Sequence, residues 1–518
     1  MDGAPAILNR RHFVAGTAAT ALAAPFMLRA QAEFTAYPFS LGVAAGDPSP
    51  DGFVIWTRLA PEPLEAHGGM AMAPVKVTWE VGSDENLRTI VAYGEEVARP
   101  ELAHSVHVEL AGLLPDRPYW YRFRSGGQKS VIGRGRTLPA LSASPAALRF
   151  GVCGCQNYED GFFTAYRHLA DEDLAFVYHY GDYIYEGWPD GINTSHSGET
   201  VVPVRRHVGQ RCYDLADYRR RYGQYKSDPD LLRAHATQTW FATFDDHEVR
   251  DNWAGDWDAA DTPPELFLTR RAAAFQAWYE HMPVRRALFP QGPAIHAYRN
   301  ARYGDLVLLD FLDTRQYRTV HPCGDDFAPP CPGLLDPRAQ MIGAEEEAWL
   351  VRNLAAPQAR WRCIAQQVMM MSIDRRTADD PQPILDMDSW AGYEAARRRL
   401  LARMRGMDNI VVLTGDEHQN FAGVLTDGDT PVAVEFVATS ISSGGDGSDL
   451  RKGADRVLAA NPQLKFTNDR RGYLVCEVGR DEWRTDFMVL DRVSSPGGRL
   501  SRRASATVAR GKPALSID

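Results

Sequence analysis

The sequence lacks several features that would define whole classes of protein. It has no apolar run long enough to remain in a bilayer as a helix, no low-complexity segment, no internal repeat and no coiled-coil pattern. Positive charge is also scarce, with 57 Lys and Arg against 67 Asp and Glu and a formal charge of −10. Because proteins that bind nucleic acids usually carry a basic face, this balance gives no support for a nucleic-acid-binding surface. A site for an anionic ligand here would need local positive charge, which bound metal cations supply.

Cysteine is rare as well. There are 7 cysteines in 518 residues, and the odd number leaves at least one thiol unpaired in an oxidising compartment. Cys323 and Cys331 bracket a proline-rich loop and are a candidate local disulfide. Cys363 and Cys476 lie in apolar β-type runs, which favours inert core thiols.

What is present is enough apolar material for a sizeable core. Hydrophobic residues make up 44% of the chain and charged residues 24%, a balance typical of a soluble globular protein. The chain is too long for one ordinary domain, so we expect a large catalytic domain and a smaller one.

Residues 1–32 carry three export signals in the expected order. A twin arginine, Arg10 and Arg11, precedes a mildly apolar stretch over 13–27, and the Ala-Gln-Ala at 30–32 fits a cleavage site. The alternative is a chance arginine pair before a short buried helix, which the order of the three signals disfavours. We predict a twin-arginine signal peptide recognised by the twin-arginine export machinery, no stable membrane anchor, and a periplasmic or secreted mature protein. Because this route carries folded proteins, a metal cofactor would be loaded in the cytoplasm.

Residues 33–142 alternate apolar and polar positions as β-strands do. The pattern is clear at 75–79 and at 106–110. At 119–123 a Tyr-x-Tyr strand follows a Leu-Pro turn and resembles the tyrosine corner of fibronectin type III sandwiches. We therefore predict an all-β sandwich domain of the fibronectin III/Ig-like type over 33–142.

Residues 148–518 alternate strands with helices. Strands are predicted at 148–155, 174–180, 240–244, 306–312, 361–370, 409–413 and 432–439, and helices at 162–171, 231–238, 264–281, 345–354 and 393–404. This order predicts an α/β catalytic domain whose sheets are covered by helices. The small, polar segment 140–147 is the predicted domain boundary. Segment 186–215 is long and poor in pattern, so we expect a loop over the site.

Four apolar strands of this region end in residues that bind metals. Cys153-Gly-Cys155 ends the first, and Gly181-Asp182 ends the second. Asp-Asp-His-Glu at 245–248 follows the third strand, and Gly-Asp-Glu-His at 415–418 follows the fourth. Because ligands collect at the carboxyl ends of strands in α/β proteins, we expect these four places to meet.

The residue types suit cations, although each place has a structural alternative. Asp182 can bridge two cations, and Tyr185, three residues later, can act as a phenolate ligand. Asp416 and His418 are two positions apart and point to the same side of an extended segment. The alternatives are a buried thiol pair or disulfide at 153–155, an Asp cap followed by packed aromatics at Asp182, and a solvated loop at 245–252. The repeated strand–Gly–Asp motif is what favours metals.

These motifs, in this order, resemble those of the PhoD-like alkaline phosphatase and phosphodiesterase family, distant relatives of purple acid phosphatases and other calcineurin-like metallophosphoesterases. The resemblance spans nearly the whole mature chain. It includes Gly-Asp-Pro at 46–48, Trp-Thr-Arg at 56–58, Cys-Gln-Asn-Tyr at 155–158, Leu-Asp-Thr-Arg-Gln-Tyr at 312–317 and Arg-Gly-Tyr at 471–473. It implies a metallophosphoesterase-type layered sandwich, with mixed sheets flanked by helices.

The resemblance also implies a ferric–calcium site. The implied ferric ligands are a thiolate, a carboxylate, a phenolate and an imidazole: Cys155, Asp182, Tyr185 and His418. Asp182 would bridge to calcium (Ca²⁺), for which Asn252 and Asp416 are suitable oxygen donors. Asp246 is a further oxygen ligand unless Asp245 takes that role, and other divalent cations remain open in place of Fe³⁺ and Ca²⁺. Cys155 and Asp416 replace an Asp and a His of the broader phosphoesterase pattern, as they do in the PhoD-like variant.

The function that this implies is an exported, metal-dependent phosphoester hydrolase acting on a small-molecule phosphomonoester, phosphodiester or both. The metals would polarise the phosphoryl oxygens, and a metal-bound hydroxide or oxide would attack phosphorus in line. His247 could protonate the leaving oxygen or bind phosphate. Arg315 is a candidate for holding substrate, and its structural alternative is an ion pair with Asp313 or another acid.

Three other functions fit parts of the pattern. A phospholipase D-like phosphodiesterase would use the same metal ligands with a different pocket. An iron-dependent oxidoreductase would use Tyr, Cys, His and Asp ligands, but the several Asp and Asn residues favour calcium or magnesium, and no facial-triad spacing is present. A non-catalytic envelope binding protein would need closed structural metal sites, whereas this cluster mixes acids, amides and a free His.

Overall fold

The structure is a computed structural model, and it describes residues 33–187, 193–194, 200–356 and 359–518. The predicted signal peptide over 1–32 lies outside the described residues, and so does part of the segment 186–215. Among the residues that the structure describes, none of the helices has the length and apolar character needed to cross a membrane.

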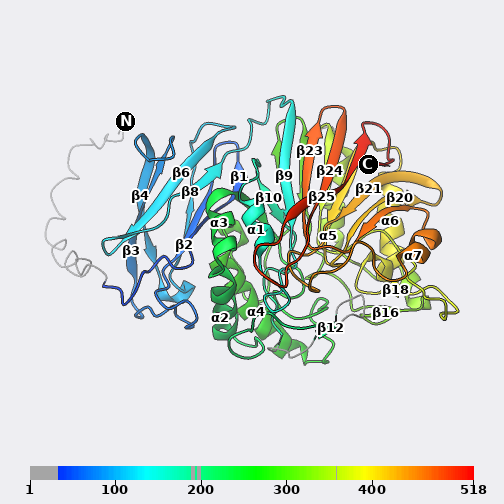
Figure 1. The fold of residues 1–518 in the computed structure, drawn as a ribbon, viewed down its shortest axis with the longest axis horizontal. Coiled ribbons are helices and arrows are strands. Elements are labelled where there is room, and N and C mark those ends of the chain that lie inside the picture. The colour runs from blue at the N-terminus through cyan, green and yellow to red at the C-terminus, as the bar shows by residue number, and fades with distance from the viewer. Residues whose placement is uncertain (1–32, 188–192, 195–199, 357–358) are drawn as a thin grey trace, which may run out of the picture.

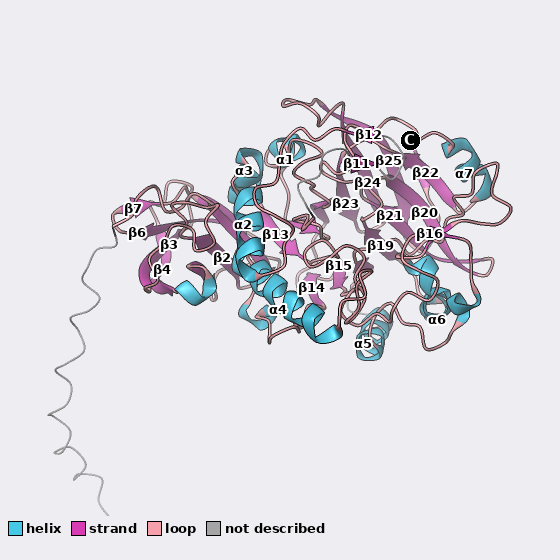
Figure 2. Ribbon diagram, turned by 90° about the horizontal axis from the view of Figure 1, so that it is seen from below, coloured by secondary structure: helices cyan, strands magenta, loops and turns pink. Residues whose placement is uncertain are grey.

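Two large mixed sheets face each other and form the body of the molecule (Figures 1 and 2). The first has ten strands in the order β26 (Ser516–Ile517), β25 (Leu500–Ala509), β24 (Glu482–Leu490), β23 (Gly472–Gly479), β9 (Ala147–Cys153), β10 (Val177–His179), β13 (Thr239–Ala242), β1 (Val43–Ser49), β2 (Gly52–Arg58) and β5 (Ser105–Glu109). The second has seven, in the order β14 (Arg299–Tyr303), β15 (Val307–Phe311), β17 (Trp361–Ala365), β19 (Ile410–Thr414), β21 (Thr430–Val437), β20 (Asn420–Asp427) and β22 (Leu464–Asn468).

Helices cover the outer faces of both sheets. Four pack beside the ten-stranded sheet, namely α1 (Thr164–Leu169), α2 (Leu215–Lys226), α3 (Pro229–Thr237) and α4 (Pro264–His281). Beside the seven-stranded sheet lie α5 (Ala344–Ala355), α6 (Glu394–Met404) and α7 (Ala454–Ala460). The space between the sheets is filled by apolar side chains of both, such as Phe150, Tyr178, Leu309, Cys363 and Val411. This layering fixes the relative positions of the strand ends from which the site is built.

The strands next to the site run parallel. In the ten-stranded sheet β9, β10 and β13 are parallel neighbours, and β1 continues the parallel set beside β13. In the seven-stranded sheet β15, β17, β19 and β21 are parallel. Parallel neighbours bring their carboxyl ends to one edge of a sheet, so the residues that follow these strands meet there.

The N-terminal region shares a sheet with the rest of the chain. Strands β3 (Val75–Gly82), β4 (Ile90–Ala98), β6 (Pro118–Ser125), β7 (Gln128–Lys129) and β8 (Gly133–Arg136) form a separate five-stranded sheet. The opposite layer of this region is β1, β2 and β5, which extend the ten-stranded sheet through the β1–β13 pair. One continuous sheet therefore crosses the predicted domain boundary.

Most predicted elements of the α/β region lie where the sequence places them, with one informative difference. The helix predicted at 264–281 is α4, and the strand predicted at 306–312 is β15. The strand predicted over 361–370 ends at Ala365 instead. Beyond it, the backbone N–H groups of Met370 and Met371 donate to the buried carboxylate of Glu435 at 2.6 and 2.7 Å, so a side chain takes the donors that a ladder would use.

The cysteines divide as the sequence suggests. Cys323 and Cys331 form a disulfide with their Cα atoms 5.8 Å apart. Cys363 and Cys476 are buried thiols between the sheets, which confirms the interpretation as core residues. A short 3-10 helix, η3 (Pro332–Leu335), follows the disulfide.

Candidate metal centre

The four predicted ligand loops converge at one edge of the sandwich. They follow β9, β10 and β13 in one sheet and β19 in the other. Each loop turns sharply, because residues in it adopt the left-handed backbone conformation that side chains other than glycine rarely take. Positive φ angles between 50° and 69° occur at Cys155, Asp182, Asn252, Asp416 and His418. This costly backbone geometry occurs at five predicted ligands, four of which line one pocket and the fifth of which, Cys155, adjoins Asp182.

Two glycines allow the loops to approach this closely. Gly154 and Gly415 lie against the ring of Tyr180, which is buried between them. A Cβ atom on Gly415 would lie 2.1 Å from a ring carbon of Tyr180, and one on Gly154 would lie 2.3 Å away. No larger residue fits without moving the ring, so the two loops owe their contact to these positions.

The four predicted ferric ligands are brought together. The Cys155 Sγ atom lies 3.4 Å from Asp182 Oδ2, and the Tyr185 hydroxyl oxygen lies 3.0 Å from the same oxygen. The Tyr185 oxygen also lies 2.9 Å from His418 Nε2. A thiol, a phenol, an imidazole and a carboxylate thus lie close together, and this donor set suits ferric iron.

A second group of oxygen donors adjoins the first. Ligand atoms of Asp182, Asp245, Asp246 and Asp416 all lie within 4.8 Å of one another. Asp182 belongs to both groups. Its Oδ1 atom lies 3.4 Å from the backbone nitrogen of His247, and its Oδ2 atom faces the Cys155 thiol. A carboxylate with its two oxygens in two donor groups has the geometry of a bridging ligand.

These donors open into a pocket of about 110 Å³ whose wall is almost entirely acidic. The predicted ligands that reach the wall are Asp182, Asp246, Asn252, Asp416 and His418, and His247 joins them. Further acids on the wall are Asp251, Asp325, Asp326, Asp386 and Asp388. Asn252 is held in place because its side-chain amide donates to the Asp325 carbonyl at 2.7 Å, which leaves its amide oxygen available.

The electrostatics of the donors call for cations. Burial, reinforced by the Asp246 carboxylate, raises the pKa of Asp182 well above its ordinary value. Burial and Asp245 raise the pKa of Asp416 in the same direction. Burial and the nearby Asp182 also raise the pKa of the Cys155 thiol and of the Tyr185 phenol. Such groups become anionic together only when positive charge balances them, so the residues present fit a metal centre.

Arg315 does not line the pocket. Its side chain is fully buried, with Nε 2.5 Å from Asp245 Oδ1 and Nη1 2.8 Å from Asp388. Its Nη2 atom lies 3.4 Å from Asp246 Oδ1. The structure therefore favours the ion-pair alternative over substrate holding, with partners other than Asp313. Because Asp245 is held by Arg315 and is absent from the pocket wall, Asp246 is the better placed of the two for a ligand.

His247 lies over the phenol ring of Tyr185, with ring centroids 4.0 Å apart. Its Nδ1 atom is 2.9 Å from Glu186 Oε2, which directs Nε2 toward the pocket. Burial alone would raise the pKa of Glu186, but the hydrogen bond with His247 and the positive charges of His247, Arg270 and Arg250 together outweigh it, so the pKa lies below its ordinary value. The imidazole is thereby oriented by a carboxylate, as a group that binds or transfers protons must be.

Two further residues support the centre, and the sequence assigned neither of them a role. The Glu248 carboxylate accepts hydrogen bonds from the backbone N–H groups of Asp182, Tyr183 and Asp245 at 2.6 to 3.0 Å, so it ties two ligand loops together. Burial raises the pKa of Glu248 to about 7. Ser443, in the loop after β21, donates to the Tyr185 oxygen at 2.8 Å. Glu248 belongs to the Asp-Asp-His-Glu motif and could have been found, whereas nothing in the sequence marks Ser443.

Comparison with known proteins gives the same reading. A family model described as PhoD-like phosphatase matches residues 150–487, and one described as PhoD-like phosphatase, N-terminal domain, matches 22–139. The chain is 44% identical over 487 residues to alkaline phosphatase D of Bacillus subtilis (strain 168), which covers 93% of this chain and 82% of that protein. A solved structure titled "Structure of PhoD" superposes with a TM-score of 0.90 at 43% identity, covering 94% of this chain and 93% of the other. These matches confirm the resemblance of the motifs, and the chain belongs to the PhoD-like phosphatase family.

Proposed function

We propose that this chain is an exported phosphoric ester hydrolase of the alkaline phosphatase D type, which cleaves phosphomonoesters, phosphodiesters or both. The observation that carries the proposal is the shared cavity in which thiol, phenol, imidazole and carboxylate groups meet at the carboxyl ends of strands from both sheets. The family assignment supports the same reaction class.

Within this proposal the donors divide between two kinds of cation. Cys155, Asp182, Tyr185 and His418 would hold a ferric ion. Asp182, Asp246, Asn252 and Asp416 would hold calcium or another divalent cation. When bound, the metals supply positive charge that polarises the phosphoryl oxygens and lowers the pKa of water.

The protein's own residues then position the ester and move a proton. His247, oriented by Glu186, faces the pocket and is placed to protonate the leaving oxygen. Glu248 keeps the ligand loops in register by holding three backbone donors. Arg315 is buried, pairs with Asp245 and Asp388 and lies 3.4 Å from Asp246 Oδ1, so within this proposal it acts on the ligand Asp246 and not on the substrate.

The finer fold assignment is also part of the proposal. We take the two facing sheets as a metallophosphoesterase-type sandwich and the region 33–142 as a fibronectin III/Ig-like sandwich, with the boundary at 142–148. In support of the second assignment, the Tyr119 hydroxyl accepts a hydrogen bond from the Leu114 N–H at 2.9 Å. A tyrosine hydroxyl bonded to the backbone a few residues upstream is the defining contact of a tyrosine corner.

Three competing functions are separable by assay. Rates on p-nitrophenyl phosphate and on bis-p-nitrophenyl phosphate distinguish a phosphatase from a phospholipase D-like phosphodiesterase. Oxygen uptake with candidate substrates would indicate an iron-dependent oxidoreductase. A non-catalytic envelope binding protein would hydrolyse neither ester at any metal content.

The central experiment combines activity with metal analysis of the purified protein. We expect ester hydrolysis that chelation abolishes and added calcium restores, together with bound iron and a visible absorption band from phenolate or thiolate bound to ferric iron. Hydrolysis that persists after complete removal of metals would overturn the proposal.

Export is tested separately. Changing Arg10 and Arg11 to Lys should leave the precursor in the cytoplasm, because the twin-arginine machinery reads this pair. Unchanged export of the double variant would contradict a twin-arginine signal, without affecting the assignment of the enzyme.

A further inference from the structure

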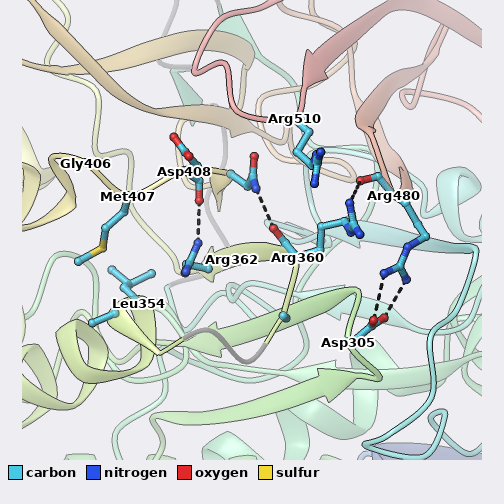
Figure 3. Close-up of a pocket in the computed structure, with 12 residues that line it drawn as sticks. Asp305, Leu354, Arg360, Arg362, Gly406, Met407, Asp408, Arg480 and Arg510 are labelled. Carbon is cyan, nitrogen blue, oxygen red and sulfur yellow. Dashed lines mark hydrogen bonds and ion pairs between the residues drawn. The ribbon is translucent and has the colours of Figure 1, made fainter.

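A second pocket lies at the edge of the sandwich opposite the metal centre. Its volume is about 670 Å³, and it opens between the two large sheets (Figure 3). One wall comes from the beginnings of β17 and β19, whereas the metal ligands follow the ends of β9, β10, β13 and β19. The other wall comes from the β23–β24 turn and the residue after β25. Because β23 runs antiparallel to β9, with Gly479 opposite Ala147, this turn lies at the end of β9 remote from Cys155.

Four arginines line this pocket, and they arrive from separate parts of the fold. Arg360 precedes β17 and Arg362 is its second residue, Arg480 lies in the β23–β24 turn, and Arg510 follows β25. Such a gathering of cations is unusual in a chain with a formal charge of −10. Figure 3 shows Arg360, Arg480 and Arg510 on one side of the pocket and Arg362 between them and Leu354.

One of the four arginines is neutralised by a carboxylate. Arg480 holds Asp305 with two nitrogen–oxygen distances of 2.9 and 3.0 Å. The second oxygen of Asp305 also accepts a hydrogen bond from Ser144 at 2.9 Å. This pair is complete by itself, and it fixes the position of the Arg480 backbone carbonyl, which accepts a hydrogen bond from Arg360 Nη1 at 3.3 Å.

The other three arginines have weaker partners. The nearest carboxylate to Arg360 and to Arg510 is Asp481, at 3.7 and 3.5 Å, and the Asp481 side chain is 83% exposed. Arg362 donates from Nη1 to the backbone carbonyl of Asp408 at 2.8 Å. Its Nε atom is buried, and within the described part of the chain it has no hydrogen-bond acceptor. Burial lowers the pKa of Arg362, with Asp408 opposing the shift, as expected of a cation whose charge is incompletely balanced.

The pocket also has an apolar side. Leu354 and Ala355 at the end of α5 and Met407 in the loop before β19 line it. Figure 3 shows Leu354 and Met407 together, across the pocket from Arg480 and Arg510. A ligand that filled the pocket would therefore meet hydrogen-bond donors at one end and carbon atoms at the other.

We infer that this pocket binds a small organic oxyanion, whose phosphate or carboxylate group contacts Arg360, Arg362 and Arg510 and whose apolar body lies against Leu354 and Met407. The planar guanidinium fork matches both kinds of oxyanion, and charge-assisted hydrogen bonds from two or three arginines are strong when partly buried. The site is separate from the metal centre, and its existence does not depend on the proposed hydrolase activity.

The test is calorimetric titration of the metal-loaded protein with phenylphosphonate, which carries an unreactive phosphorus–carbon bond. We expect one binding component that the double variant Arg360→Gln, Arg362→Gln weakens by at least about tenfold, since each charge-assisted hydrogen bond is worth about that factor. Binding at the metal centre, if present, gives a second component that the double variant retains.

A matched control for Arg510 is an arginine of β25, the strand that Arg510 follows. Arg502 lies in β25 with a side chain 55% exposed, close to the 51% of Arg510, but outside the pocket. Arg502→Gln should leave both components unchanged, while Arg510→Gln should weaken the arginine-dependent one by a few fold. Because Arg510 is exposed and lies at a strand end, this single variant is informative even if the double variant unfolds, which a melting curve would reveal.

Two further probes identify the chemistry of the ligand. Benzoate in place of phenylphosphonate distinguishes a carboxylate ligand from a phosphate ligand, and binding of either at the arginines supports the site. Inorganic phosphate should bind there about tenfold more weakly than phenylphosphonate, because it leaves the apolar side unfilled. If no probe shows a component that depends on Arg360, Arg362 or Arg510, the inference is wrong.

Discussion

Two cysteines near the end of β9 lie two positions apart and have different surroundings. Cys155 meets Asp182 and Asp416 at the metal centre, whereas Cys153 is buried beside Tyr166 in the core under the helices. Cys153 therefore offers a matched control for every substitution of Cys155, with the same side chain, the same burial and a position at the end of the strand that precedes Cys155.

Cys155→Ala should lower iron content and ester hydrolysis together. Loss of a direct ligand costs at least as much as loss of a supporting contact, so we expect metal affinity to fall by more than about 100-fold. Elemental analysis and initial rates measure both effects. Cys153→Ala should retain metal and activity and lose only stability; equal behaviour of the two variants would contradict the assignment of Cys155.

Substitution of Arg315 should mainly lower stability, in contrast to substitution of Cys155. Removing its charge leaves the buried Asp245 carboxylate without its cation, whereas Asp388 keeps Arg318, and the loss costs about 3–5 kcal/mol. Arg315→Met should therefore lower the free energy of unfolding in urea by that amount and loosen the metal site. A substrate-holding arginine would instead raise KM and leave stability unchanged, and that outcome would restore the original prediction.

Lys226 at the end of α2 is fully buried above the ring of Trp56, with Nζ 4.3 Å from the ring centroid. Its hydrogen bond goes to the Tyr183 hydroxyl at 3.2 Å, and the neighbouring imidazoles of His179 and His235 have pKa values lowered by burial. Burial lowers the pKa of Lys226 to about 7, from an ordinary value of 10.5. Between these values the unfolded lysine holds a proton that the folded one has released.

Above pH 10.5 the lysine is neutral in both states, and it does not lower the free energy of unfolding. As the pH falls from 10.5 toward 7, protonation favours the unfolded state, so the free energy of unfolding decreases. Between pH 8 and 10 the free energy of unfolding should rise with pH less steeply in Lys226→Met than in the original chain. The two slopes should differ by about 1.4 kcal/mol per pH unit. Urea unfolding at several pH values measures the slope. Lys465→Met, at an exposed lysine, is the control and should leave the slope unchanged.

At the scale of elements, the disulfide closes a loop that forms one wall of the metal pocket. The residues between Cys323 and Cys331 include Asp325, whose carbonyl holds the Asn252 amide, and Asp326, which lines the pocket. Strand β16 (Phe327–Ala328) pairs with β18 (Leu385–Asp386), which carries a further acid of the pocket wall. The covalent link thus restrains a segment that positions a predicted ligand.

Changing Cys323 and Cys331 together to Ser should lower the free energy of unfolding by about 2–3 kcal/mol, from the entropy of a short closed loop. Calcium should bind more weakly as well, because Asn252 loses a fixed partner. Unfolding curves and calcium titration of the double variant measure the two effects. Unchanged calcium affinity would show that the loop is not needed to place Asn252.

The elements that could be predicted are those whose burial pattern is local. Helix α4 and strand β15 have apolar faces, and the four ligand loops follow apolar strands, three of them with glycine beside the ligand. Helix α2 was not predicted, because its buried face is made of tyrosines and charged side chains whose partners lie elsewhere, such as the Arg219–Glu280 ion pair. The role of Arg315 depends on acids about 70 residues away in sequence, which no local pattern reveals.

At the scale of the whole molecule, the continuous ten-stranded sheet joins the N-terminal region to the metal-binding part. Beyond the β1–β13 pair, Trp56 Nε1 donates to the Glu280 carbonyl at 3.0 Å, and Arg58 Nη1 lies 2.6 Å from His281 Nε2. All of these side chains are buried. Pairing between strands almost two hundred residues apart could not be read from the sequence, which predicted a strand at 240–244 and a β-rich region over 33–142 but not their pairing.

This shared sheet predicts one cooperative unit. Calorimetric unfolding of the mature chain should give a single transition, and a chain that lacks residues 33–142 should aggregate, because the deletion uncovers β13 and the buried face of α4. Differential scanning calorimetry and solubility measure these outcomes. Two separate transitions in the intact chain would show that the two parts fold independently.

The left-handed backbone at the ligands has a further consequence. Asparagine tolerates this conformation at least as well as aspartate, and it brings no negative charge into a crowded acidic cavity. Asp182→Asn or Asp416→Asn should therefore give a metal-poor chain that is at least as stable as the original metal-free one. If selection acted on foldability alone, asparagine would replace aspartate at these two positions over time. The two acids therefore persist only while catalysis is under selection.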